Sequence, residues 1–122
     1  MDGLDELVKL LFPGNSAHQQ LVVAILVELK WAEGQVLPVL EPIADKYGFS
    51  PRTLETVRAK MRRMGLIDHI SRFNKRHGYR ECWVASRRFE KSLVILAEAI
   101  CKFRARRGPG QEEKDRDLQR YL

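Results

Sequence analysis

Cysteine, long apolar runs and targeting signals are scarce in this 122-residue chain. The two cysteines, Cys82 and Cys101, lie outside any CxxC spacing and predict no disulfide framework; a redox role for them stays open. No run approaches the roughly 20 apolar residues of a membrane span, because Glu28 interrupts the longest candidate, residues 21–29. The first residues are acidic and lack the basic flank of a signal peptide. We therefore expect a cytoplasmic protein with no membrane partner.

Signatures of catalysis and metal binding are also lacking. The histidines, His18, His69 and His77, are scattered without HExxH spacing. We find no phosphate-cradling glycine loop, no paired carboxylates and no nucleophile motif. His69, His77, Cys82 and Asp68 could converge across a hairpin as a metal site, with ordinary surface side chains as the alternative. We expect no enzyme, no cofactor and no metal.

Charge is unevenly distributed along the chain, whose net charge is +6. Residues 1–49 hold 3 Lys/Arg and 7 Asp/Glu, a net charge of −4. Residues 50–88 hold 11 basic and 3 acidic residues, a net charge of +8. Positive charge concentrated on one segment is expected of a protein that binds a polyanion. A solvated basic surface without a nucleic-acid role is the alternative.

Residues 40–66 predict two short helices joined by a tight turn. The first helix ends at Tyr47, because Gly48 can adopt the left-handed conformation that closes a helix. The second begins with Ser50 as its N-cap and Pro51 at the first helical position, where the missing N–H costs nothing. Two helices across a three-residue break form a helix-turn-helix motif.

The residues that would lock these two helices together carry a family resemblance. Small and apolar residues and a turn glycine stand where helix-turn-helix proteins need them, at Ala44, Gly48, Leu54 and Val57, with Ile43, Tyr47 and Phe49 as further core residues. Residues 64–67 are similar to the end of a recognition helix and the start of a wing. Over about residues 21–86 the chain thus resembles winged helix-turn-helix DNA-binding proteins. That resemblance implies a second helix in the major groove and a hairpin beside it.

The remaining pattern predicts a mainly α fold with a small β-hairpin, of the α+β class. We expect N-terminal helices within residues 1–33, the second capped by Ser16 and buried at the centre, and a short strand at 35–37. The next helix starts between Pro38 and Pro42. The wing occupies residues 67–85, with strands at 67–72 and 78–85. A long helix capped by Ser86 follows over 86–107, closing a single domain of residues 1–107, and residues 108–122 form a charged tail, mobile or loosely docked.

The candidate DNA-binding residues lie on the proposed recognition helix and wing. On a helix over residues 50–64, Leu54, Val57 and Met61 face the core and the opposite face is polar or basic. Near the N-terminus, Arg can read guanine and a Thr methyl can meet thymine, while the later Lys and Arg hold phosphates. The alternative is that Arg52 and Arg58 pair with Glu55. The candidates are Ser50, Arg52, Thr53, Thr56, Lys60 and Arg63 on the helix, and Arg72, Lys75, Arg76 and Arg80 on the wing.

A heptad spacing in the last long helix predicts a homodimer. Apolar residues recur there at intervals of 4, 3, 4 and 3, at Phe89, Leu93, Leu96, Ile100 and Phe103. Such a seam exposed on a monomer would be a large apolar patch. The alternative is that it packs on the chain's own first helices. Homodimeric winged-helix transcriptional regulators of the MarR and PadR type, found in bacteria and archaea, use terminal helices in this way, and this chain resembles their general layout.

These features together predict a homodimeric winged-helix transcriptional regulator that binds double-stranded DNA sequence-specifically. A two-fold dimer implies a pseudo-palindromic site. The alternative is a winged-helix module for protein–protein contact or an architectural role in a replication, transcription or viral assembly. Whether a small-molecule effector exists stays open.

Overall fold

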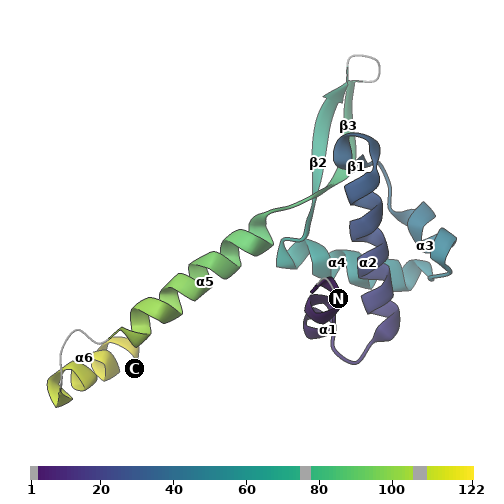
Figure 1. Cartoon of the computed structure of the whole chain (residues 1–122). Coiled ribbons are helices and arrows are strands. Elements are labelled where there is room, and N and C mark those ends of the chain that lie inside the picture. The colour runs from purple at the N-terminus through teal and green to yellow at the C-terminus, as the bar shows by residue number, and fades with distance from the viewer. Residues whose placement is uncertain (1–2, 75–77, 106–109) are drawn as a thin grey trace. The chain divides into compact units, whose positions relative to one another are not determined.

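The structure of the protein, a computed structural model, describes residues 3–74, 78–105 and 110–122; the side chains of residues 72–79 also lie outside this description. The chain divides into two units, Met1–Phe89 and Glu90–Leu122. The first combines helices with a small antiparallel sheet, and the second is helical (Figure 1). The predicted α+β class with a mainly helical chain is confirmed. The division falls after Phe89, and the single domain expected over residues 1–107 stays a prediction.

The first unit runs from two N-terminal helices through a helix pair to a hairpin. Its elements are α1 (Leu4–Leu11), α2 (Ser16–Trp31), a 3-10 turn (Glu33–Gln35), β1 (Val36–Leu37), α3 (Glu41–Tyr47), α4 (Pro51–Met64), β2 (Ile67–Asn74) and β3 (Gly78–Ala85). Helix α5 (Arg88–Arg104) begins in the first unit and continues in the second, which also contains α6 (Gln111–Tyr121).

Local signals set the ends of α3 and α4 as predicted. Gly48 ends α3 with φ 79° and ψ 28°, and its N–H donates to the carbonyls of Ala44 and Asp45. Ser50 caps α4, because its Oγ accepts from the Thr53 N–H at 3.1 Å. The cap of α2 is Asn15 and not the predicted Ser16: Asn15 Oδ1 accepts from the His18 N–H at 3.0 Å.

Helix α2 supplies the centre of the core, as its apolar sequence predicted. Its buried side chains pack with those of α1, α3, α4 and the sheet. The largest fully buried side chains of the whole core are Leu21, Val22, Ile25, Leu29, Leu40, Leu54, Val57, Met61 and Ile67. Ile43 and Ala44 are also buried, and Phe49 is partly buried. The prediction for Tyr47 is wrong, since its side chain is 46% exposed and its hydroxyl donates to Glu28 instead.

Three strands form an antiparallel sheet in the order β1-β3-β2. The β2–β3 register pairs Ile67 with Ala85 at one end and Asn74 with Gly78 at the other, so β2 extends two residues beyond the predicted strand. Strand β1 pairs Val36 with Val84, which ties the segment before α3 to the hairpin after α4. The sheet therefore joins the chain segment before the α3–α4 pair to the segment after it.

The second unit differs from the prediction in both of its helices. Helix α5 ends at Arg104, before the predicted 107. Residues expected to form a mobile or loosely docked tail form helix α6, whose first turn holds Glu112 and Glu113 and whose last turn holds Arg120. Acidic residues at the start and basic residues at the end of a helix interact favourably with its dipole. The Phe103 and Tyr121 rings meet edge to face at 5.6 Å.

Candidate nucleic-acid interface

Helix α4 has one buried face and one polar face. Leu54, Val57 and Met61 are buried, as predicted from their spacing. The opposite face exposes Arg52, Thr56, Ala59 and Arg63. Within the described residues, neither the Arg52 nor the Arg63 guanidinium has a hydrogen-bond or ion-pair partner. Two guanidiniums are thus available on this face.

The hydroxyl groups at the start of α4 are hydrogen-bonded within the helix. Ser50 Oγ lies 2.9 Å from Thr53 Oγ1, besides accepting from the Thr53 N–H. Thr56 Oγ1 donates to the Arg52 carbonyl at 3.1 Å. The Thr56 hydroxyl proton is thus engaged, and its oxygen lone pairs and the threonine methyl groups remain for an external ligand.

Lys60 does not belong to the free basic surface. Its Nζ donates to the carbonyl of Leu11, the last residue of α1, at 2.6 Å, and lies 4.4 Å from the centroid of the Phe12 ring. The carbonyls of the last turn of a helix lack partners within the helix, so Lys60 caps α1 with a positive charge. This contact gives Lys60 a structural role, and the phosphate contact stays a prediction. Its partner lies 49 residues away in the sequence, beyond the reach of local patterns.

Arg58 is also held within the fold, by Glu41 rather than by Glu55. Its Nη1 donates to Glu41 Oε1 at 2.9 Å, and its guanidinium lies 5.6 Å from the centroid of the Trp83 ring. This hydrogen bond lowers the pKa of the Glu41 carboxyl. The alternative pairing with Glu55 is not found among the described residues. Arg58 instead links α4 to the start of α3 and to the sheet.

A cluster at the C-terminal end of α4 was not recognised from the sequence. The Arg88 guanidinium donates to the Arg62 carbonyl at 2.9 Å and to the Asp68 carboxylate. The hydrogen bond from Arg88 holds the pKa of Asp68 below its ordinary value. Gly65 closes α4 here with φ 85°, and a Cβ on it would lie 2.7 Å from the Arg88 Cβ. The start of α5 therefore sits tightly against the end of α4.

The hairpin holds the remaining predicted contacts. Arg72 and Arg80 are opposite each other in the register of β2 and β3, and the Arg80 side chain is exposed. Lys75 and Arg76 lie outside the described residues, as does the side chain of Arg72. Nearer the core, the His69 and Trp83 rings stack at 4.3 Å. Of the wing residues, Arg80 alone can be placed as a surface cation.

Four members of the predicted dimer seam are exposed on α5. The exposed fractions are 48% for Leu93, 64% for Leu96, 45% for Ile100 and 53% for Phe103. Phe89 differs, because it is partly buried against the core of the first unit. Phe89 therefore lies in the first unit and the other four seam residues lie in the second, and the dimer seam itself stays a prediction.

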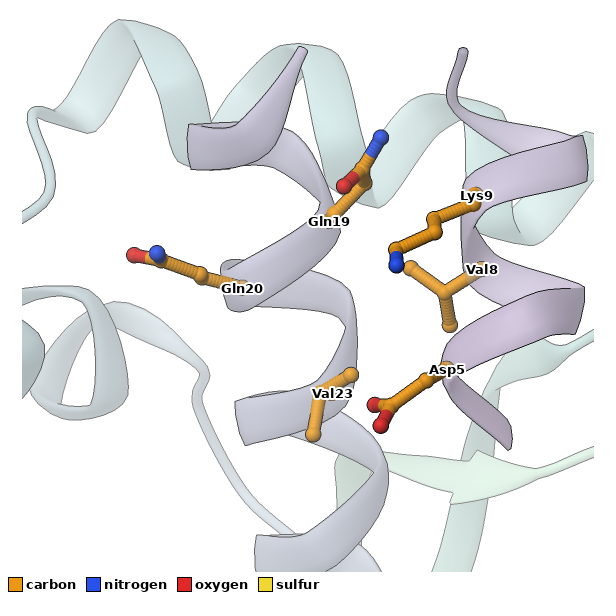
Figure 2. Close-up of a pocket in the computed structure, with 6 residues that line it drawn as sticks. All are labelled: Asp5, Val8, Lys9, Gln19, Gln20 and Val23. Atoms are coloured by element: carbon orange, nitrogen blue, oxygen red, sulfur yellow. The ribbon is translucent and has the colours of Figure 1, made fainter. Parts of the chain in front are cut away.

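A groove of about 280 Å³ lies between α1 and α2 (Figure 2). Its lining combines Asp5, Val8 and Lys9 from α1 with Gln19, Gln20 and Val23 from α2. The Gln19 amide donates to the Phe12 carbonyl at 2.7 Å, which ties it to the fold. No group of His, Cys, Asp and Glu in the described part of the chain could hold a metal ion, and His77 lies outside that part. In the same residues, no helix is long and apolar enough to cross a membrane.

Comparison of the chain with protein families, characterised proteins and solved structures found no match.

Proposed function

We propose that this protein is a homodimeric winged-helix regulator of transcription that binds double-stranded DNA. In this proposal α4 enters the major groove and the β2–β3 hairpin contacts the backbone or minor groove. The order of elements supports it: α2, β1, α3, α4 and the hairpin follow one another, with three residues between α3 and α4. That order is the layout of winged-helix proteins, in which the second helix of the pair reads the DNA.

The exposed, unpartnered guanidiniums of α4 carry the proposal. Arg58, Lys60 and Arg88 are engaged by groups of the protein itself, whereas Arg52 and Arg63 have no such partner in the described residues. They lie eleven residues apart on one face, a rise of about 16 Å along the helix. In this proposal Arg52, in the first turn, binds guanine O6 and N7, and Arg63, in the last turn, contacts a phosphate.

Positive charge is concentrated in α4 and the segment after it, whereas the residues before α4 are acidic overall. Residues 1–49 carry a net charge of −4, and residues 50–88, which include α4 and the hairpin, carry +8. A polyanion is attracted to the basic segment and repelled by the acidic one. Arg80 extends the positive charge to the hairpin.

Selection of bound sequences from random duplex DNA tests the proposal. A consensus with two half-sites about one helical turn apart is expected of a two-fold dimer. Arg52→Ala should weaken binding to that consensus by about 5- to 150-fold and relax specificity at one base pair. Arg63→Ala should weaken binding to all duplexes alike. Lys30→Ala, an exposed lysine on α2, is the control and should change neither.

Retention of duplex affinity in both arginine variants would contradict the proposal. The absence of any consensus, together with dependence of a protein assembly on Leu93 and Ile100, would favour the protein-binding alternative. Circular dichroism of each variant should match the wild-type spectrum, since both arginines are exposed and unpartnered in the described residues.

A further inference from the structure

Helix α5 presents an apolar stripe that the described part of the chain leaves exposed. Leu93, Leu96, Ile100 and Phe103 are each 45% to 64% exposed, and no residue of α5 is buried. Tyr121 of α6 contacts one edge of the Phe103 ring, yet half of that side chain stays accessible. A 17-residue helix is about 25 Å long, enough for a short two-helix interface.

The residues beside this stripe indicate which way a second helix would run. With Leu93 and Ile100 at heptad position a and Leu96 and Phe103 at d, position e is occupied by Glu90, Ala97 and Arg104. Position g on the other side is occupied by Ser92 and Ala99. The e side therefore has an acidic residue and a basic residue placed symmetrically, seven positions either side of an alanine.

From this symmetry we infer that α5 pairs with α5 of a second copy in antiparallel orientation, with Glu90 beside Arg104 of the partner subunit. In an antiparallel pair, e positions face e positions. When the two helices cross near Ala97, the Glu90–Arg104 ion pair forms twice, once on each side of the two-fold axis. Leu93 packs against Phe103 of the partner subunit, and Leu96 against Ile100 of the partner subunit.

A parallel, in-register pair lacks this complementarity. There, position g faces position e of the following heptad in the other helix. Ser92 would then face an alanine, and Ala99 would face Arg104, so neither contact is an ion pair. The small side chains of Ala97 and Ala99 are also best placed in the antiparallel arrangement, where they flank the crossing point and permit close approach of the backbones.

This inference rests on the proposed homodimer and adds its geometry. It makes Glu90 and Arg104 the residues that determine orientation and leaves the apolar stripe to supply affinity. Glu98 and Lys102 lie on the opposite side of α5 from the stripe, at positions f and c. They provide matched controls, because the same charge changes there leave the seam untouched.

Disulfide mapping distinguishes the two orientations. The variant Leu93→Cys/Phe103→Cys/Cys101→Ser is oxidised as the full chain, digested and examined by mass spectrometry for linked peptides. The antiparallel pair predicts a link between positions 93 and 103. Within one helix these positions are about 15 Å apart, too far for a disulfide, so that link must join two chains. Links of 93 to 93 and 103 to 103 would overturn the antiparallel orientation while leaving the dimer and DNA binding in place.

Charge reversal gives a second test that keeps the apolar stripe intact. By sedimentation equilibrium, Glu90→Arg and Arg104→Glu should each weaken the dimer about tenfold, because two attractive pairs become repulsive. The double variant should return to within about threefold of the wild-type dissociation constant. Glu98→Arg and Lys102→Glu should leave it unchanged. The inference would be overturned if the double variant lost as much dimer affinity as the two single variants together, or if the wild-type chain stayed monomeric. Duplex binding measured on the same samples reports separately on the DNA proposal.

Discussion

Replacing Lys60 with methionine separates the structural and DNA-binding roles of the basic residues on α4. Methionine keeps most of the apolar stem, so the change removes chiefly the ammonium group. That group donates to the Leu11 carbonyl at 2.6 Å and lies 4.4 Å from the Phe12 ring centroid. A hydrogen bond from a charged donor contributes about 1.5–3 kcal/mol, and a cation over an aromatic ring about 0.5–1 kcal/mol. At the lower end of these ranges, we expect a net loss of about 2 kcal/mol.

The assay is urea unfolding followed by circular dichroism, with a thermal melt beside it. For a unit of 89 residues, a loss of about 2 kcal/mol lowers the melting temperature by roughly 10 °C. Arg63→Met is the matched control on the same helix. Its guanidinium is exposed and unpartnered in the described residues, so its free energy of unfolding should stay within about 0.5 kcal/mol of wild type.

Duplex binding should show the opposite ranking of the two variants. Lys60→Met should retain the wild-type dependence of affinity on salt, because its ammonium is occupied by α1. Arg63→Met should make that dependence shallower by about 0.9 in the slope of log K against log salt for each phosphate that the variant no longer neutralises. A Lys60→Met protein as stable as wild type would refute the capping role. Loss of the same salt dependence in both variants would return Lys60 to the DNA interface.

Two further substitutions test the junction between α4 and α5. In urea unfolding, Gly65→Ala should destabilise the protein by clearly more than Gly48→Ala. Both glycines have positive φ, which costs alanine about 1–2 kcal/mol at either site, but only at Gly65 would the new Cβ meet other atoms of the fold, 2.7 Å from the Arg88 Cβ. Equal losses at the two sites would contradict the tight junction. Asp68→Asn should cost less than about 1 kcal/mol at neutral pH, since the ion pair with Arg88 is half exposed. The folded-state pKa of Asp68 is lowered, so its contribution is present above about pH 4 and is lost as pH falls through the lowered value. The difference in free energy of unfolding between wild type and Asp68→Asn should therefore shrink as the pH falls below about 4.

Local chemistry was enough to predict the helix pair and the buried face of its second helix. Gly48, Ser50 and Pro51 act through contacts within four residues, and the structure places each as the sequence indicates. The spacing of Leu54, Val57 and Met61 likewise determines which face of α4 is buried, and so which face is free.

Contacts between distant segments account for what the sequence did not reveal. Helical periodicity puts Lys60 beside the exposed face, but its long side chain reaches the end of α1, and no local pattern encodes that meeting. Arg58 had a nearby acidic residue as an obvious partner, yet Glu41, 17 residues earlier, is the one that packs next to it. Tyr47 has apolar bulk typical of a core residue, and its hydroxyl is drawn to the surface by Glu28. The α6 helix was missed because it has few apolar residues, although its end charges favour a helix.

The salt dependence of duplex binding tests the central proposal most directly. Fluorescence anisotropy with a labelled duplex, measured between 50 and 200 mM salt, reports the number of phosphates neutralised by the protein. If α4 and the hairpin neutralise about six phosphates, affinity should fall by roughly 10³-fold across that range. Arg52→Ala/Arg63→Ala should flatten the dependence, and Lys60→Met should not. Affinity that stays constant from 50 to 200 mM salt would contradict the account of this surface as a DNA interface.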